Sequence, residues 1–132
     1  MIPVQTAWGS DIVLRIGTYR INATVANTPD SRELGLMRQT QLCENCGMLF
    51  VFPRAGKHNF WMKDTLMPLS IAFIAADGKI LNIAEMQANT SNIHSALDNA
   101  LYALEMNKGW FNTRAIKQQS RIKGLQQAPQ GY

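Results

Sequence analysis

Two cysteines, Cys43 and Cys46, are the residues of this sequence whose types and spacing most directly suggest chemistry. A Cys-x-x-Cys spacing suits a redox-active pair, half of a zinc site or a local disulfide. A thioredoxin-like pair should begin a helix after a strand, whereas Cys43 to Gly47 has the composition of a turn. A zinc site needs two further ligands, and the two histidines, His58 and His94, lack the usual paired spacing. Unreactive turn cysteines, a disulfide and redox or metal work therefore all remain open.

Methionines form a second group of side chains that can do chemistry. Met37, Met48, Met62 and Met67 lie in the same stretch as both cysteines and His58. Thioethers together with thiolates select copper(I), so copper binding through Met, Cys and His is one hypothesis. Methionines interleaved with leucines and aromatic residues more often fill a core. Copper is therefore kept as an alternative, and our main interpretation includes no metal ligand and no cofactor.

A third group of residues is mostly polar and surrounds an aromatic stretch. We expect this group to bind a ligand. It consists of Glu33, Arg38, Trp61, Lys63, Asp64 and Thr65. If residues 58–62 form a strand, alternation puts Phe60 and Met62 on one face and Trp61 and Lys63 on the other. Trp61 would then wall a cleft with Lys63 on its floor and Asp64 at its rim. In the simpler interpretation these charged side chains are solvated around a turn.

Catalysis has weaker support in the sequence than binding. Glu33 or Asp64 can serve as the general base of a hydrolase, which we keep as an alternative. The chain has no Gly-x-Ser-x-Gly elbow, no His-Glu-x-x-His helix and no phosphate-binding glycine loop. We therefore assign no catalytic residue and leave open whether the protein is an enzyme. The main hypothesis is a non-enzymatic module that binds a small molecule or a protein partner.

The elements that must position these residues are mostly short strands. Alternating or continuous apolar runs predict strands at 11–19, 21–25, 48–52, 58–62, 69–75, 79–86 and 100–106. Pro53 is expected to end one of them. The Asp77-Gly78 pair between two apolar runs is the strongest hairpin signal in the chain. In the last strand, Leu101, Ala103 and Glu105 are expected to share one face.

Two short helices complete the prediction. Thr28-Pro29-Asp30-Ser31 supplies a cap, a proline and an acid for a helix that runs to about Leu36. The spacing of residues 110–119 suits a second helix, with Arg114, Lys117 and Arg121 on a common face. Strands without regular strand-helix alternation predict a mainly β fold, either a small barrel or a rolled antiparallel sheet with one or two short helices; α+β is the alternative.

Length and charge place limits on domains and partners. The 132 residues suit one globular domain at 11–124, with an N-terminal extension at 1–10 and a flexible tail at 125–132. Residues 106–132 contain five basic residues and no acid, so a partner with an anionic surface is an option, whereas nucleic acid is not expected. No window predicts a transmembrane span, and the first residues do not have the pattern of a secretory signal.

Four motifs in order resemble those of domain-of-unknown-function family 192: Arg32-Glu-Leu-Gly-Leu-Met37, Gly47-Met-Leu-Phe-Val-Phe52, Phe60-Trp-Met-Lys-Asp-Thr65 and Pro68-Leu-Ser-Ile71. The resemblance runs from about Val25 to Gly124. It implies a compact, mainly β prokaryotic domain, often exported or lipid-anchored, without an established activity.

This sequence departs from the family pattern at two polar positions. The family usually has Asn at the position of Asp64 and Asp at the position of Ser70. A hydrolytic mechanism that needs a carboxylate at position 70 would therefore not transfer to this chain. The Gly-Asp ending that many relatives carry after the last helix is also missing.

Overall fold

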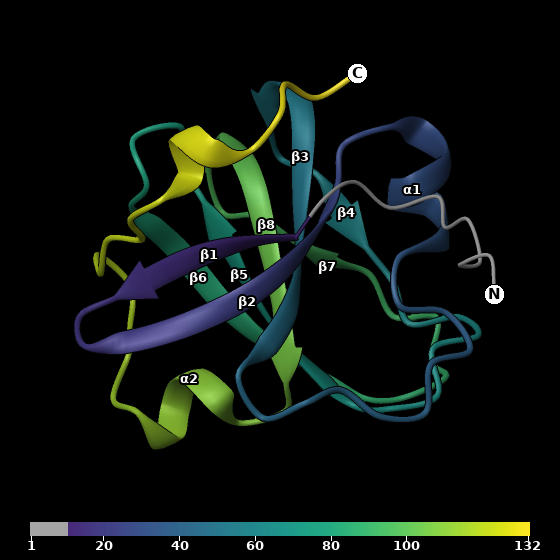
Figure 1. Cartoon of the computed structure of the whole chain (residues 1–132). Coiled ribbons are helices and arrows are strands. Elements are labelled where there is room, and N and C mark those ends of the chain that lie inside the picture. The colour runs from purple at the N-terminus through teal and green to yellow at the C-terminus, as the bar shows by residue number, and fades with distance from the viewer. Residues whose placement is uncertain (1–10) are drawn as a thin grey trace, which may run out of the picture.

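The computed structural model describes residues 11–132, so the predicted N-terminal extension at 1–10 lies outside the described part. Its centre is a six-stranded sheet, shown in Figure 1. In spatial order the strands are β1 (Asp11–Ile16), β2 (Tyr19–Ala26), β3 (Cys46–Gly56), β8 (Ala100–Asn107), β5 (Leu69–Ile74) and β6 (Ile80–Met86). A separate two-stranded ribbon pairs β4 (Asn59–Phe60) with β7 (His94–Ser95). The mainly β prediction is confirmed.

The sheet is mixed and open, which corrects two details of the prediction. β2 and β3 pair in parallel, while the other neighbouring strands of the sheet are antiparallel. The parallel pair arises because the chain crosses between these strands through α1 (Pro29–Leu34) instead of a tight hairpin. The sheet does not close into a barrel.

The chain after α2 links the two edges of the open sheet. The Arg15 N–H of β1 donates to the Lys123 carbonyl at 3.0 Å, and the Ile80 N–H of β6 donates to the Ser120 carbonyl at 2.8 Å. This segment therefore covers backbone groups that would otherwise remain unpaired at both edges.

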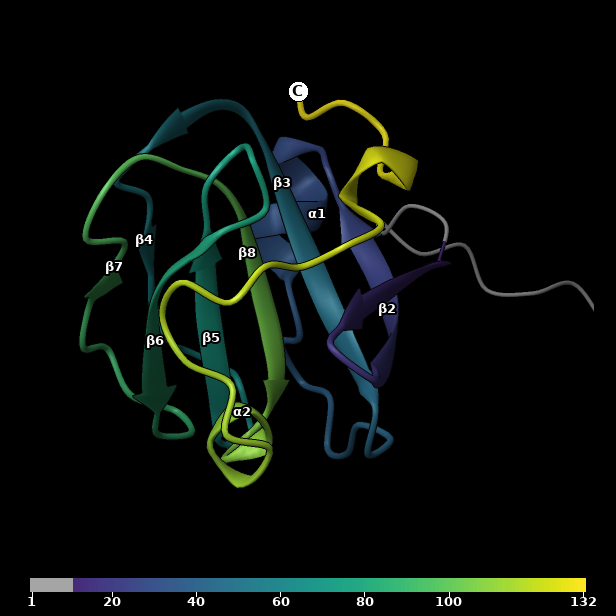
Figure 2. The same cartoon turned by 90° about the vertical axis from the view of Figure 1, so that its left-hand side faces the viewer.

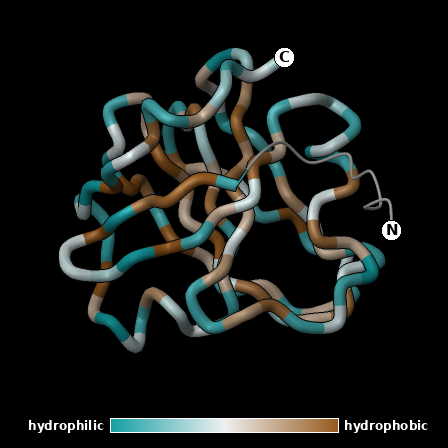
Figure 3. The backbone as a smooth tube through the Cα atoms, viewed as in Figure 1, coloured by the Kyte–Doolittle hydropathy of each residue, from teal (hydrophilic) through white to brown (hydrophobic). Residues whose placement is uncertain are grey.

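Apolar side chains cover both faces of the sheet. On β3, Leu49 and Val51 join one buried cluster and Met48 and Phe50 join the other. The C-terminal segment crosses one face and α1 lies behind the other, as seen in Figure 2. Burial on both faces explains why β3 and β5 contain continuous apolar runs instead of an alternation. Figure 3 shows this as brown stretches along the strands and teal on many of the turns.

The predicted helix start is confirmed in α1. Thr28 is the N-cap: its hydroxyl accepts from the Ser31 N–H at 3.2 Å, and the Ser31 hydroxyl accepts from the Thr28 N–H at 3.0 Å. The helix ends at Leu34 because Gly35 adopts a positive φ of 48°. This reciprocal cap fixes the start of the segment that later forms one side of a pocket.

The predicted Asp-Gly hairpin is also confirmed, because β5 and β6 pair antiparallel across it. Gly78 adopts a φ of 92°, a backbone conformation that is costly for any residue with a side chain. The Asp77 carboxylate accepts from the Lys79 N–H at 3.0 Å, and this hydrogen bond helps to hold the pKa of that carboxyl below its usual value. The turn therefore needs both residues of the pair.

Two strand and helix ends differ from the prediction. β3 does not stop at Pro53 but continues to Gly56 through a register shift, and such irregular positions of a strand tolerate a proline. The second helix, α2, spans only Trp110–Thr113. It stops because Ala115 adopts a φ of 56°, after which the chain turns toward β6. Arg114, Lys117 and Arg121 therefore do not share a helical face.

Residues 125–132 contain a 3-10 helix, η1 (Leu125–Gln127), and contact the domain. The Gln127 amide donates to the Val13 carbonyl at 2.9 Å, and the Tyr132 N–H donates to the Asn27 carbonyl at 2.8 Å. The flexibility of this segment and the limits of the domain remain predictions. Among residues 11–132, no helix is both long enough and apolar enough to cross a bilayer.

Candidate ligand pocket

A pocket with a volume of about 240 Å³ opens between α1 and the strands β3 and β4. Residues 32–37 form one side, and side chains of β3 and β4 form another. Thr65 and Glu105 also line it, so the pocket collects residues from five separate parts of the chain. This volume is somewhat below the usual range for ligand sites and suits a very small molecule or a single side chain of a larger ligand.

Aromatic rings form most of the apolar wall. Phe50, Phe52, Phe60 and Trp61 all line the pocket. The Phe60 ring meets the Phe50 ring edge to face with 4.9 Å between centroids, and it meets the Phe52 ring at 6.0 Å. His58 stacks on Phe52 with 3.7 Å between centroids. These contacts hold the rings in fixed orientations, whereas Trp61 remains 47% exposed at the mouth.

Three of the six predicted site residues meet in this pocket, namely Glu33, Trp61 and Thr65. Glu33 comes from α1, Trp61 directly follows β4, and Thr65 lies in the next turn. Thr65 is buried, and its hydroxyl donates to the Lys63 carbonyl at 3.4 Å. The structure therefore brings together residues that are up to 32 positions apart in the sequence.

The other three predicted residues, Arg38, Lys63 and Asp64, are not part of the lining. The Arg38 N–H donates to the Asp64 carbonyl at 2.9 Å, and both residues have positive φ values of 63° and 57°. The Lys63 ammonium lies 5.6 Å from the centroid of the Trp61 ring. The expected alternation of Trp61 and Lys63 on a strand is wrong, because β4 already ends at Phe60.

Arg32 is the positively charged residue of the lining, and its guanidinium is already engaged. One terminal nitrogen donates to the Val51 carbonyl at 2.9 Å and the other to the Tyr132 carbonyl at 2.5 Å. The group also lies 5.4 Å from the centroid of the Phe52 ring. Burial lowers the pKa of Arg32, but an arginine remains charged at neutral pH. Arg32 therefore ties α1 to β3 as well as facing the pocket.

Glu105 is the residue of the pocket that the site prediction missed. Its side chain is 4% exposed, on a strand position flanked by Met48 of β3 and Ile71 of β5. Within residues 11–132 its carboxyl makes no hydrogen bond or ion pair, and the residue lines the pocket. Burial raises the pKa of this carboxyl from 4.5 to about 8, so it keeps its proton at neutral pH.

A sequence signal for Glu105 did exist. The alternation of the last strand put it on one face with Leu101 and Ala103, and Ala103 is fully buried. A glutamate at an inward position of a strand is rare unless it is paired or functional. We predicted the orientation correctly, but sequence alone could not show that a pocket reaches this position.

Ser70 is not part of the lining of this pocket. Its hydroxyl donates to the Glu85 carboxylate at 2.5 Å and accepts from the Gly109 N–H at 2.8 Å. The same Glu85 oxygen accepts from Gly109 at 3.1 Å. Ser70 therefore links β5, β6 and the turn after β8, which is a structural arrangement.

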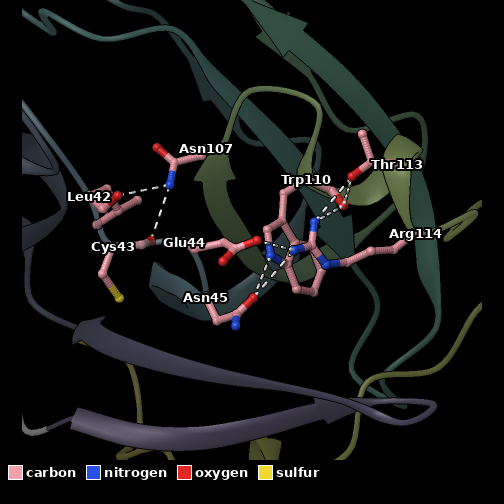
Figure 4. A network of polar contacts seen from close by, with 8 residues as sticks. All are labelled: Leu42, Cys43, Glu44, Asn45, Asn107, Trp110, Thr113 and Arg114. Atoms are coloured by element: carbon pink, nitrogen blue, oxygen red, sulfur yellow. Dashed lines mark hydrogen bonds and ion pairs between the residues drawn. The ribbon is translucent and has the colours of Figure 1, made fainter.

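The two cysteines form a disulfide, with 5.0 Å between their Cα atoms. Figure 4 shows the network that holds the loop around it. The Asn107 amide donates to the carbonyls of Leu42 and Cys43 at 3.0 and 3.1 Å, and the Trp110 indole donates to the Asn45 amide oxygen at 3.1 Å. The loop between α1 and β3 is thereby fastened to β8 and α2.

Arg114 completes this network. Its guanidinium lies 4.3 Å from the centroid of a Trp110 ring, donates to the Trp110 carbonyl at 3.0 Å and pairs with Glu44 at 3.4 Å. A second basic residue of the C-terminal part, Arg121, pairs with Asp77 at 3.3 Å. Part of the basic charge expected to meet an anionic surface is therefore used within the domain.

The copper hypothesis finds no ligand set within residues 11–132. The disulfide leaves no thiolate to bind a metal, and no group of three or more Cys, His, Asp or Glu residues is placed to hold an ion. Met48 and Met62 are fully buried in the apolar cluster next to the pocket. His58 stacks on Phe52 instead of approaching these sulfurs.

The fold and the pocket define a class of protein: a small, mixed β-sheet domain with one buried acid at an aromatic pocket. The DUF192 family, described as an uncharacterized ACR family, matches residues 12–124, and the chain belongs to this family. The resemblance seen in the sequence motifs is thus confirmed. No curated protein matches the chain.

Two solved structures resemble the whole domain. One, from Sinorhizobium meliloti 1021, is named as a candidate transcription regulator; it is 28% identical, with a TM-score of 0.85 over 92% of this chain and 98% of the other. The second, a protein of unknown function from Novosphingobium aromaticivorans DSM 12444, is 27% identical, with a TM-score of 0.80 over 86% and 84% of the two chains. These similarities support the fold and assign no activity.

Proposed function

We propose that this domain binds a small molecule in the pocket between α1 and β3, with the aromatic rings as walls and Glu105 as the polar anchor. One observation carries the proposal: a buried carboxyl without a partner among residues 11–132 opens onto a pocket. Burying such a group without a hydrogen bond costs stability. A ligand that bonds to Glu105 would remove this cost, and that gain would contribute to its affinity.

We propose that the predicted site residues serve the same role in two ways. Trp61, Glu33 and Thr65 line the pocket. Outside the lining, the Lys63 ammonium lies 5.6 Å from the Trp61 ring centroid, and the Arg38 N–H donates to the Asp64 carbonyl. We propose that the lining residues contact the ligand and that the charged residues outside it influence its approach.

A ligand screen with matched variants tests the proposal. Thermal shift over a panel of small molecules should give hits with the parent protein that Glu105→Gln and Trp61→Ala weaken at least tenfold. Arg20→Ala, a change at an exposed position of β2 outside the pocket lining, is the control and should bind like the parent. If both pocket variants fold and bind every hit as the parent does, this pocket is not the binding site.

A hydrolase is the second candidate, because two carboxyl groups in different surroundings line the same pocket. Glu33 is exposed and Glu105 is buried. The Glu33 carboxylate would take a proton from water as the general base, while the protonated Glu105 would give its proton to the leaving group. Asp64, the other base considered, does not line the pocket. Incubating the same panel and finding product that both Glu33→Gln and Glu105→Gln abolish would favour this candidate.

The disulfide and the short helices bear on where the domain works and on which partners it can have. The Cys43–Cys46 disulfide supports an oxidising compartment outside the cytoplasm, in line with the export suggested by the family resemblance. The name of the Sinorhizobium protein is no basis for proposing DNA binding by this chain. The helices within residues 11–132 span six, four and three residues, too short for a helix that reads the major groove.

A further inference from the structure

We propose that the ligand of this pocket is a small organic cation, an amine or a quaternary ammonium group that pairs with Glu105 among the aromatic rings. This inference rests on the proposed function and specifies its ligand class. Two independent features point to it, namely the charges of the lining and the type of side chain that forms the walls.

The charges of the lining leave one acid without a counterpart. The pocket contains two carboxyl groups, Glu33 and Glu105, and one base, Arg32. Arg32 donates to two backbone carbonyls and lies on Phe52, so its hydrogen-bonding groups are largely committed. Glu105 is neutral in the empty pocket, so a ligand with a positive charge would pair with it as it ionises, whereas an anionic ligand would oppose that ionisation.

The walls are of a type that stabilises cations. Ring faces carry negative electrostatic potential and attract ammonium groups within about 6 Å of the centroid. The molecule already uses this interaction twice around the pocket, with Arg32 at 5.4 Å from the Phe52 centroid and Lys63 at 5.6 Å from the Trp61 centroid. Phe50 and Phe60 line the interior of the pocket. A cation beside Glu105 would therefore lie among rings as well as next to a carboxylate.

Cation binding should also release a proton. The titratable groups on the pocket are Glu105 on β8 and Arg32 and Glu33 on α1, while β3 and β5 place Met48 and Ile71 beside Glu105. The pKa of Glu105 is raised to about 8, so the empty pocket holds a proton there at pH 7. An ammonium ligand favours the carboxylate form, and the proton leaves to solvent as the ion pair forms. A neutral hydrogen-bond acceptor would instead leave that proton in place.

Pairs of a cation and a neutral molecule of the same shape test whether the ligand must carry a positive charge. Choline and its neutral carbon isostere 3,3-dimethyl-1-butanol have nearly the same shape, and n-butylamine and 1-butanol form a second pair. Isothermal titration with the full chain at pH 7 in phosphate and in MOPS, neither of which is a net cation, measures affinity and proton release together. We expect at least one cation to bind tenfold or more tightly than its isostere and to release roughly one proton. Nα-acetyl-lysine methylamide tests whether the cation is instead a side chain of a peptide.

Two variants test whether the preference for cations depends on Glu105. Glu105→Gln keeps the shape without the charge and should abolish both the cation preference and the proton release. Trp61→Ala, at the exposed mouth, keeps the anchor and should weaken the cations while the released proton remains. If each isostere binds as well as its cation, the cation inference is wrong and the binding proposal stands. If cations fail to bind while other molecules of the screen bind in the pocket, the inference is overturned in the same way.

Discussion

Ser70 and Glu105 are two buried polar residues on neighbouring strands with opposite surroundings. Ser70 pairs with Met106 and Ile71 pairs with Glu105 in the register of β5 and β8, so the two are one position apart on opposite faces of the sheet. Both are almost completely buried. Ser70 has hydrogen bonds to Glu85 and Gly109, whereas Glu105 has no partner among residues 11–132.

The difference separates a structural polar group from a candidate functional one. The hydrogen bonds of Ser70 join three segments, and such satisfied contacts stabilise a fold. Glu105 joins nothing and stays neutral only because burial opposes its charge. Polar groups of the second kind cluster at functional sites, where a partner arrives from outside. This contrast supports a structural role for Ser70 and is the basis for the binding role that we propose for Glu105.

The largest expected effect concerns pH and Glu105. Between pH 4.5 and about 8 the unfolded chain has lost this proton and the native protein keeps it, so the free energy of unfolding falls as pH rises. The slope is at most about 1.4 kcal/mol per pH unit, and it ends above pH 8, where both states are ionised. Below pH 4.5 both states are protonated and the contribution vanishes.

Urea unfolding of the parent and of Glu105→Gln, measured from pH 4 to 9, isolates this contribution. The difference between the two curves should rise steadily with pH through the window, in favour of the variant, and then level off. Parallel curves would show that Glu105 is not buried in its neutral form, and the contrast with Ser70 would then disappear.

A medium effect is expected for Ser70→Ala. This change removes both hydrogen bonds of the hydroxyl and leaves Gly109 with only the 3.1 Å contact to Glu85. The loss should be about 1–2 kcal/mol in the free energy of unfolding, with unchanged ligand binding. Ser91→Ala, an exposed site, is the control and should stay within about 0.5 kcal/mol of the parent. Equal stabilities of the two variants would contradict a structural role for Ser70.

The smallest effect is expected for Arg114→Lys, which tests the network of Figure 4. Lysine keeps the charge but loses the planar group that stacks on Trp110 and reaches Asn45. We expect a loss of about 0.5–1 kcal/mol in chemical denaturation, without a change in ligand affinity. Arg54→Lys, at an exposed position, provides the matched control. A drop in affinity for Arg114→Lys would show that the two faces are coupled.

Local signals predicted the parts of the fold that depend on neighbouring residues. The Thr28 to Ser31 cap and the Asp77-Gly78 turn act over three or four residues, so their outcome can be seen in the sequence. The parallel pairing of β2 and β3 depends on how the chain crosses after α1, which no local pattern encodes. The early end of α2 has a similar cause, since the following segment leaves to pair beside β6.

The pocket was predictable only in part. Trp61 and Glu33 were identified from their types, because an aromatic residue beside charges suggests a ligand site. Glu105 belongs to the site only because the fold brings β8 to the same pocket as residues some 70 positions earlier in the chain. The state of Cys43 and Cys46 depended on a loop geometry that brings the two sulfurs together. Long-range contacts therefore decide the residues that the prediction missed.

The position of β8 in the middle of the sheet has a consequence for synthesis. It is the last strand along the chain, yet it lies between β3 and β5. A nascent chain that has not reached Ala100 therefore exposes two strand edges with free N–H and C=O groups, which are prone to pair with other chains. Glu105 lies on this final strand, so neither the sheet nor the lining of the pocket can be complete before β8 has left the ribosome.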